Sequence, residues 1–129
     1  MTKLVTISLD QLPDSVRKSL AYESSHAHLA AAGTVSARFT TVLTANTTRA
    51  VTLPSAAAPT SPLGTTYTIV KVDSGGSGLV ALTPATGEKI GAGIANATWS
   101  SPASAINSIT LVSNGVDTWT IALQTGTWA

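Results

Sequence analysis

The sequence predicts an all-β protein, either a sandwich or a jelly-roll-like barrel, with a short N-terminal arm that contains one helix. The clearest local signal is in residues 104–128, where two apolar, β-branched runs flank an Asn114-Gly115 pair. An Asn-Gly pair favours the positive φ angles of a tight hairpin. Residues 64–72 form a similar run that ends in a Gly-rich turn. About seven to nine such runs follow one another at intervals of roughly 8–12 residues, the spacing of a sandwich or barrel.

The composition fits one domain whose core is built from short, branched side chains. A chain of 129 residues is long enough for a single modest core. Only 10% of the residues are charged and only 5% are aromatic. Val, Ile and Leu therefore supply most of the apolar volume, which suits a pleated sheet. Such a low content of charge also indicates that part of the surface is covered in an assembly.

The same composition argues against several classes of function. The net charge is +1 and the basic residues are scattered, so we expect no nucleic-acid partner. The chain has no cysteine, which excludes disulfides and thiolate chemistry. No apolar run reaches the roughly 18 residues that a membrane-spanning helix needs, so we expect no membrane partner. Residues 1–10 lack the features of a signal peptide, which predicts synthesis in the cytoplasm without an obvious route of export.

Residues 1–33 predict an N-terminal arm. Residues 3–9 alternate weakly, as in a short strand, and residues 12–23 predict a helix of roughly two or three turns, with Pro13 in its first turn. The helix has one narrow apolar stripe with a spacing of four residues, formed by Leu12, Val16 and Leu20. Because so short a helix is marginal alone, it must dock on its own domain, on a sister subunit or on a partner. Residues 26–33 are either a linker or the end of the helix.

The β domain is predicted over residues 34–129, because the apolar period changes to two at its start. Its first strand, residues 34–43, is expected to place five alternate residues on one face, namely Val35, Ala37, Phe39, Thr41 and Leu43. Residues 50–53 predict the next strand. Three prolines make residues 54–63 a loop, because proline removes a backbone donor and restricts its neighbour.

The remaining elements follow from the same pattern of runs and turns. Residues 79–83 are expected to pair back onto the strand at residues 64–72, across the Gly-rich turn between them. Residues 89–90 predict a short strand. Residues 91–102 are expected to be irregular and anchored by Trp99.

No pattern in the chain predicts catalysis, and we expect neither an enzyme nor a cofactor. The acidic residues lie at predicted helix ends and turns, so tertiary structure alone would have to bring a glycosidase-type pair together. Residues 73–78 are rich in glycine but lack the lysine and the following helix of a phosphate-binding loop. A small glycan-acting enzyme remains an alternative that would depend on Glu23, Asp73, Glu88 and Asp117.

His26 and His28 have a spacing that permits metal binding in one circumstance. In an extended segment, residues two apart point to the same side. Around a threefold axis, two histidines from each of three chains would offer a set of imidazoles suited to a transition metal. The other interpretation is two exposed histidines in a polar linker. A helix over residues 24–28 would separate the two side chains and remove the site.

The three tryptophans are the other conspicuous residues. Trp119 alternates in phase with apolar neighbours, which favours a place in the core. Trp99 and Trp128 are the candidates for an exposed aromatic at a subunit or receptor interface, and Trp128 is the stronger of the two. No polar cluster accompanies Trp99 that would support stacking on a sugar.

Several segments between residues 48 and 119 resemble, in order, a β module of tailed-phage virion proteins. The module is found in capsid decoration proteins, head fibres, and tail or neck fibres. The matching segments are Leu53-Pro54, the Tyr67-Thr68-Ile69 strand into Asp73, Thr83-Pro84 with Gly87 and Ile90, and the Val112-Ser113-Asn114-Gly115 hairpin with Trp119. The sequence departs from the module at residues 87–91, and residues 1–33 lie outside the resemblance.

The resemblance implies a homotrimer without catalytic activity on the virion surface, bound to the major capsid protein of a phage. It also implies that fibre tips of this kind hold a metal through His-x-His pairs such as His26 and His28. We expect the arm to dock on the capsid through its apolar residues, which are Leu4, Ile7, Leu12, Val16 and Leu20. The short chain favours a compact knob over a long fibre. The alternative is a tail or neck fibre module that binds host surface glycans.

Overall fold

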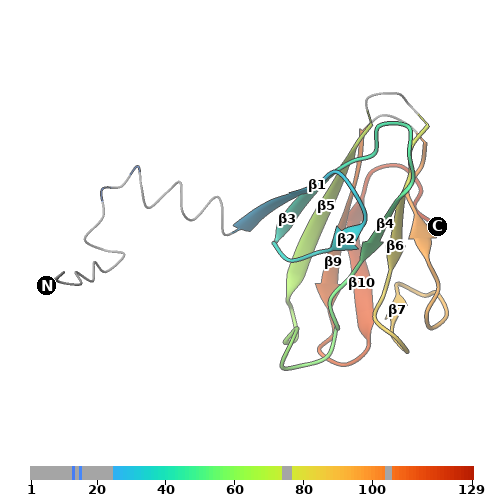
Figure 1. The fold of residues 1–129 in the computed structure, drawn as a ribbon. Helices are drawn as coiled ribbons and strands as arrows, with labels where there is room; N and C mark the ends of the chain where they lie inside the picture. Colours follow the sequence, from blue (N-terminus) through green and yellow to red (C-terminus); the bar gives the residue numbers. More distant parts are fainter. Residues whose placement is uncertain (1–12, 14, 16–24, 74–76, 104–105) are drawn as a thin grey trace, which may run out of the picture.

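The computed structural model describes residues 13, 15, 25–73, 77–103 and 106–129, which form a sandwich of two β sheets (Figure 1). The predicted all-β sandwich is therefore confirmed. The predicted strand at residues 3–9 lies outside the described residues, and so does nearly all of the predicted helix at residues 12–23. Within the described residues, no helix has the length and apolar character to cross a bilayer.

Ten strands make up the two sheets, which Figure 1 shows as two layers. The larger sheet has the order β1 (His26–Leu29), β3 (Phe39–Leu43), β5 (Thr66–Val72), β9 (Ile106–Ser113), β10 (Thr118–Gln124) and β7 (Lys89–Ile90). The smaller sheet has the order β2 (Gly33–Thr34), β4 (Arg49–Thr52), β6 (Val80–Thr83) and β8 (Trp99–Ser100). The sheets thus begin at His26, inside the segment expected to be an arm.

The first six strands follow one repeated step, which we call a winding: a strand in the larger sheet and then a strand in the smaller one. The three windings are β1–β2, β3–β4 and β5–β6, and each lies parallel to the one before it in both sheets. β9 and β8 then cover β5 and β6 in antiparallel fashion. The fold is a sandwich, but most of its neighbouring strands are parallel.

The predicted first strand, residues 34–43, is two strands in different sheets. Val35 and Ala37 are buried. The chain bends at residues 37–38 as it crosses from the smaller sheet to the larger, and the alternation then shifts by one residue. In β3 the buried residues are therefore Thr40 and Val42. The expectation that Phe39, Thr41 and Leu43 share a face with Val35 and Ala37 was wrong, because these three point away from the core.

The expected pairing of residues 79–83 with residues 64–72 was also wrong. β6 lies in the smaller sheet, beside β4 and β8, so the loop between β5 and β6 crosses the sandwich. Asp73 helps to hold this crossing. Its carboxylate accepts hydrogen bonds from the backbone N–H groups of Asn46 at 2.9 Å and Gly78 at 2.8 Å.

The predicted hairpin of residues 104–128 is confirmed as β9 and β10, which pair antiparallel. Its turn is longer than a two-residue Asn-Gly loop. Gly115 has a φ of 76°, and the Asn114 side chain closes the loop by accepting hydrogen bonds from three backbone N–H groups. The three donors are Val116, Asp117 and Thr118.

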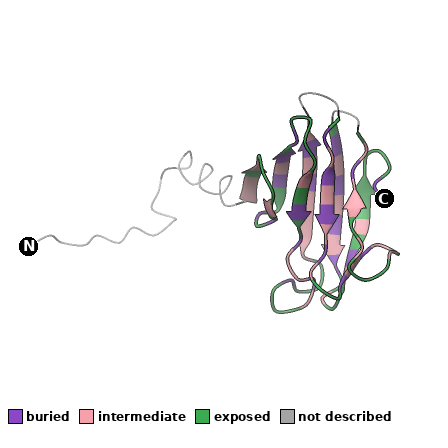
Figure 2. Ribbon diagram, turned by 45° about the vertical axis from the view of Figure 1, so that its right-hand side comes forward, coloured by how far each residue is buried: buried purple, intermediate pink, exposed green. Residues whose placement is uncertain are grey.

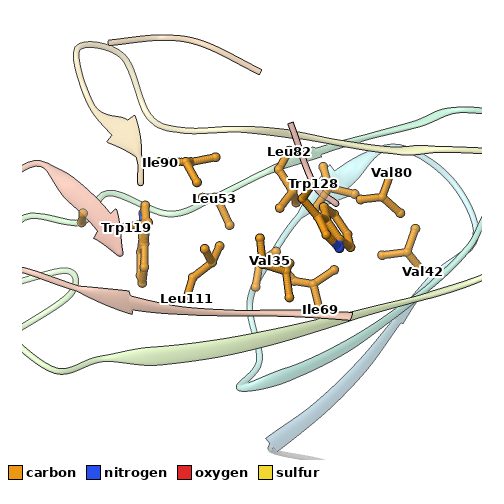
Figure 3. Close-up of a cluster of buried hydrophobic side chains, with 13 residues drawn as sticks. Val35, Val42, Leu53, Ile69, Val80, Leu82, Ile90, Leu111, Trp119 and Trp128 are labelled. Atoms are coloured by element: carbon orange, nitrogen blue, oxygen red, sulfur yellow. The ribbon is translucent and has the colours of Figure 1, made fainter. Parts of the chain in front are cut away.

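The core between the sheets is continuous and consists mainly of branched aliphatic side chains. Figure 3 shows Trp119 near Ile90 and Leu111 in one part of the core, and Trp128 among Leu82 and Val80 in another. Each indole N–H has a backbone acceptor, the carbonyls of Pro54 and Thr125 respectively. One charged side chain also enters the sandwich. Lys71 is fully buried and donates to the Pro102 carbonyl at 2.8 Å.

Candidate interaction surface

The side of the larger sheet that faces away from the core is the broadest candidate surface. Side chains alternate across a strand, and the strand register therefore decides which ones share this side. Figure 2 shows the alternation of buried and exposed residues along these strands. We call this surface the outer face. It consists of His26, His28, Phe39, Thr41, Leu43, Thr66, Thr68, Val70, Val72, Ile106, Ser108, Thr110, Val112, Thr120 and Leu123.

Large apolar side chains are exposed on the outer face. Phe39 is 48% exposed, Ile106 is 70% exposed and Leu123 is 71% exposed, and Leu43 is exposed as well. The other large apolar residues exposed in the described part of the chain lie in loops, and they are Leu63, Ile94 and Val116. The smaller sheet turns only small side chains outward, such as Ala50, Thr52 and Ala81. Large apolar groups on a sheet surface are therefore confined to the outer face.

The fifteen residues named for the outer face include no Asp, Glu, Lys or Arg. Among the described residues, the charged side chains lie outside this set: Arg38, Arg49, Lys71, Asp73, Glu88, Lys89 and Asp117. Lys89 on the edge strand β7 points to the same side of the sheet, because it pairs with Thr118 while Ile90 and Trp119 are buried. It lies at the far edge of the sheet, where its charge acts on Asp117. Two hydroxyl groups in the middle of the face, those of Thr68 and Thr110, pair with each other at 3.0 Å. The surface is thus apolar or hydroxylated, with charge only at one rim.

The two histidines of the predicted metal site lie at the opposite rim, on the edge strand β1. β1 is extended, and the register places His26 beside Phe39 and His28 beside Thr41. The rings of His26 and Phe39 stack, with centroids 5.1 Å apart and planes 19° apart. The described residues contain no group of three or more potential ligands. Metal binding by His26 and His28 stays a prediction that requires further chains.

The two candidate interface tryptophans have different positions. Trp128 is 2% exposed and packs in the core, so the prediction that it is an exposed interface residue was wrong. The reason is local. Ala129 exchanges two backbone hydrogen bonds with Ser100, which draws the end of the chain onto β8 and its neighbouring indole inward. Trp99 is half-buried and packs against the core from β8. Trp119 is buried, as predicted.

The predicted capsid-docking residues Leu4, Ile7, Leu12, Val16 and Leu20 lie outside the described residues. The structure fixes only where this segment joins the sandwich. Residue 25 leads directly into β1, the edge strand whose His26 and His28 belong to the outer face. The N-terminal residues therefore join the sandwich at an edge strand of the larger sheet.

The acidic residues considered for catalysis form hydrogen bonds within or between loops, where the structure describes them. Glu88 accepts hydrogen bonds from the Ala56 backbone and the Ser55 hydroxyl, and Asp73 binds two backbone N–H groups. Asp117 is fully exposed, and the hydrogen bond from the Thr118 hydroxyl, followed by that from Asn114, lowers the pKa of its carboxyl. No pocket opens in the surface formed by the described residues.

Sequence reasoning missed the outer face, although part of its signal was present. Strand β9 alternates strictly, with Ile106, Ser108, Thr110 and Val112 all out of phase with the core. An apolar residue in that phase, such as Ile106 or Val112, indicates a surface that needs cover. Phe39 and Leu43 were placed on one face with Val35 and Ala37 because the change of sheet at residues 37–38 has no local mark.

Comparison with known proteins gives no assignment. No protein-family model matches the chain, and no curated protein matches it.

Proposed function

We propose that this chain is a structural protein of a tailed-phage virion, which decorates the capsid surface as a homotrimer and binds the major capsid protein through its N-terminal residues. The observation that carries the proposal is the outer face, a broad uncharged surface with exposed large apolar side chains. Such a surface supports a role in assembly. The resemblance of residues 48–119 to virion β modules supplies the kind of assembly.

The two parts of the chain have different roles in this proposal. The sandwich holds the three copies together, and each copy contributes one arm. Leu4, Ile7, Leu12, Val16 and Leu20 supply the apolar contacts of that arm with the capsid. Three weak contacts made at once raise the overall affinity far above that of one contact, because the second and third bindings are intramolecular. A protein that binds only the assembled shell also stabilises that shell by mass action.

The first test locates the protein on virions. Full-length chain is coupled to gold particles, added to purified virions of a phage whose genome carries the gene, and imaged by electron microscopy. Label spread over the capsid faces supports the decoration role. Label confined to one vertex contradicts it and favours the alternative, a tail or neck component that binds host glycans.

A second test separates the arm from the sandwich. The double variant Leu12→Asp and Val16→Asp places two charges in the predicted apolar stripe. We expect it to keep the mass of the native oligomer and to lose binding to virions. The matched control is Asp14→Asn, which changes a charge outside the stripe and leaves binding intact. Full binding by the double variant would contradict the proposed role of the arm.

A further inference from the structure

We propose that the outer face is buried in solution against the outer faces of the other copies of this chain in the trimer. This inference deepens the proposed function, which requires self-association but assigns no surface to it. It names the interface, and it is tested on the purified protein without virions.

The outer face has the size of a protein interface. Four of its strands, β3, β5, β9 and β10, have five to eight residues each, and β1 adds four. At ~3.3 Å per residue and ~4.8 Å between strands, they span about 500 Å² of sheet plane. Side chains that stand off this plane make the accessible area larger than the plane itself. The face is therefore on the scale of a standard protein interface, which buries about 800 Å² per partner.

The distribution of charge indicates which partner covers the outer face. A charged partner would have to lose the hydration of its charges against a face that offers no counter-charge, which is costly. Residues 1–24 of this chain are a poor cover for the same reason. They hold six of its thirteen charged residues, namely Lys3, Asp10, Asp14, Arg17, Lys18 and Glu23. Other copies bring faces that are equally uncharged apart from Lys89 at the rim, so the middles of the faces meet without repulsion and without a buried unpaired charge.

The chemistry of the face also suits packing of one sheet on another. Its middle consists of Val70, Val72, Thr68, Thr110 and Val112, which are side chains of similar height. Two sheets pack face to face at ~10 Å through side chains of this kind. The paired hydroxyls of Thr68 and Thr110 enter such an interface with a hydrogen bond already made. Phe39, Leu43, Ile106 and Leu123 surround this middle with larger apolar groups.

The test measures the mass of the full-length chain in solution by sedimentation equilibrium over a range of concentrations. We expect a multiple of the 13.0 kDa chain mass. The variant Val70→Lys puts a charge at the centre of the face, where the side chain points outward from β5. We expect it to raise the dissociation constant at least 100-fold, because an uncompensated buried charge costs about 3–5 kcal/mol. The matched control Ala81→Lys places a lysine on the outward side of the smaller sheet and is expected to leave the mass unchanged.

A second variant tests the interface in case Val70→Lys fails to fold. Leu123 is 71% exposed in the single chain, so Leu123→Lys leaves the sandwich intact and still places a charge on the face. Loss of the oligomer in both variants, with unchanged circular dichroism, supports the interface. A wild-type chain that stays at single mass up to roughly 100 μM overturns it, since specific interfaces of this size associate more tightly. Retention of the oligomer by both variants overturns it as well.

The outcomes for this inference and for the proposed function are distinct. A chain that forms the oligomer through this face but binds no virion leaves the inference standing and removes the decoration role. A chain that binds capsids as a single copy removes the inference and the trimer, and it leaves the decoration role standing.

Discussion

At the scale of single residues, Glu88 was a candidate catalytic acid in the sequence. In the structure its carboxylate holds a loop. Glu88 is 6% exposed, and its two carboxylate oxygens accept the Ala56 backbone N–H at 2.5 and 2.9 Å and the Ser55 hydroxyl at 3.0 Å. These bonds join the loop before β7 to the Pro-rich loop after β4. Nothing in the sequence marks this connection, because the partners are more than thirty residues apart.

The variant Glu88→Gln keeps the shape of the side chain and removes its charge. We expect a loss of about 1–3 kcal/mol in the free energy of unfolding, because the buried donors lose a charged acceptor. Urea denaturation followed by tryptophan fluorescence measures the change. The exposed neighbour Thr86 gives the control, since Thr86→Ala is expected to stay within ~0.5 kcal/mol of the wild type. A Glu88→Gln protein as stable as the wild type would show that the loop is held in another way.

The lowered pKa of Asp117 predicts that the free energy of unfolding depends on pH in the acidic range. The hydrogen bonds of Asp117 to Thr118 and Asn114 lower the pKa of the folded carboxyl from 3.8. A carboxylate with a lowered pKa adds stability above its unfolded pKa, and this contribution is lost as the pH falls through the folded value. The slope of stability against pH below 3.8 should therefore be shallower in Asp117→Asn than in the wild type.

The cause of that pKa shift has its own measurement. The Thr118 hydroxyl is the largest contributor, so Thr118→Val should move the Asp117 carboxyl titration, followed by NMR, toward its ordinary value. An unchanged titration midpoint in this variant would assign the shift to another neighbour.

Trp128 belongs to the core although it stands next to the C-terminus. We expect Trp128→Ala to lower the free energy of unfolding by about 3–5 kcal/mol, the usual cost of removing a buried aromatic side chain. The exposed Gln124 provides the comparison, because Gln124→Ala removes no buried surface. A stable Trp128→Ala protein with weakened self-association would reverse this assignment and return Trp128 to the interface.

At the scale of elements, local sequence patterns predicted which segments are strands but not where each strand lies. The runs that became β4, β5, β6, β7, β9 and β10 were all expected as strands at or near their observed positions. The sheet that holds each run depends on contacts with distant segments. β6 follows β5 across a short Gly-rich loop, yet it pairs with β4 and β8 in the other sheet.

The β9–β10 hairpin offers a test of an element through one residue. Asn114 accepts three backbone N–H groups and thereby fixes the loop. We expect Asn114→Ala to destabilise the protein by about 1–2 kcal/mol, because these donors lose their acceptor at an exposed site. The control is Val116→Ala in the same loop, whose side chain is 67% exposed. Equal stability of both variants would mean that Gly115 and the strands alone determine the turn.

At the scale of the whole molecule, the start of the sandwich is the point on which sequence and structure differ most. The sequence placed it at residue 34, since the small residues of 26–33 look like a connector. The structure has β1 at His26–Leu29, with Leu29 packed against the core. A four-residue parallel strand leaves almost no pattern of its own, because its neighbour in the sheet is supplied by a later segment.

Two shortened chains test this boundary. A chain that begins at Ser25 keeps every strand that the structure describes and is expected to unfold within a few degrees of the full-length protein. A chain that begins at Thr34 loses β1 and the contacts of Leu29, and we expect it to be less stable by about 2–4 kcal/mol. Differential scanning calorimetry measures both. Equal melting temperatures would place the boundary at residue 34 after all.

Because of the windings, strands could be added in evolution at one end of the sandwich and not at the other. β5 and β6 are sealed by β9 and β8, whereas each earlier winding repeats the step before it. An internal gene duplication that copied one winding between β2 and β3 would give the new strands parallel neighbours in both sheets and would leave the antiparallel pairs β5–β9 and β6–β8 unchanged. A descendant of this chain can therefore grow in steps of ~4.8 Å, the distance between neighbouring strands. Each step would widen the outer face while its chemistry stayed the same.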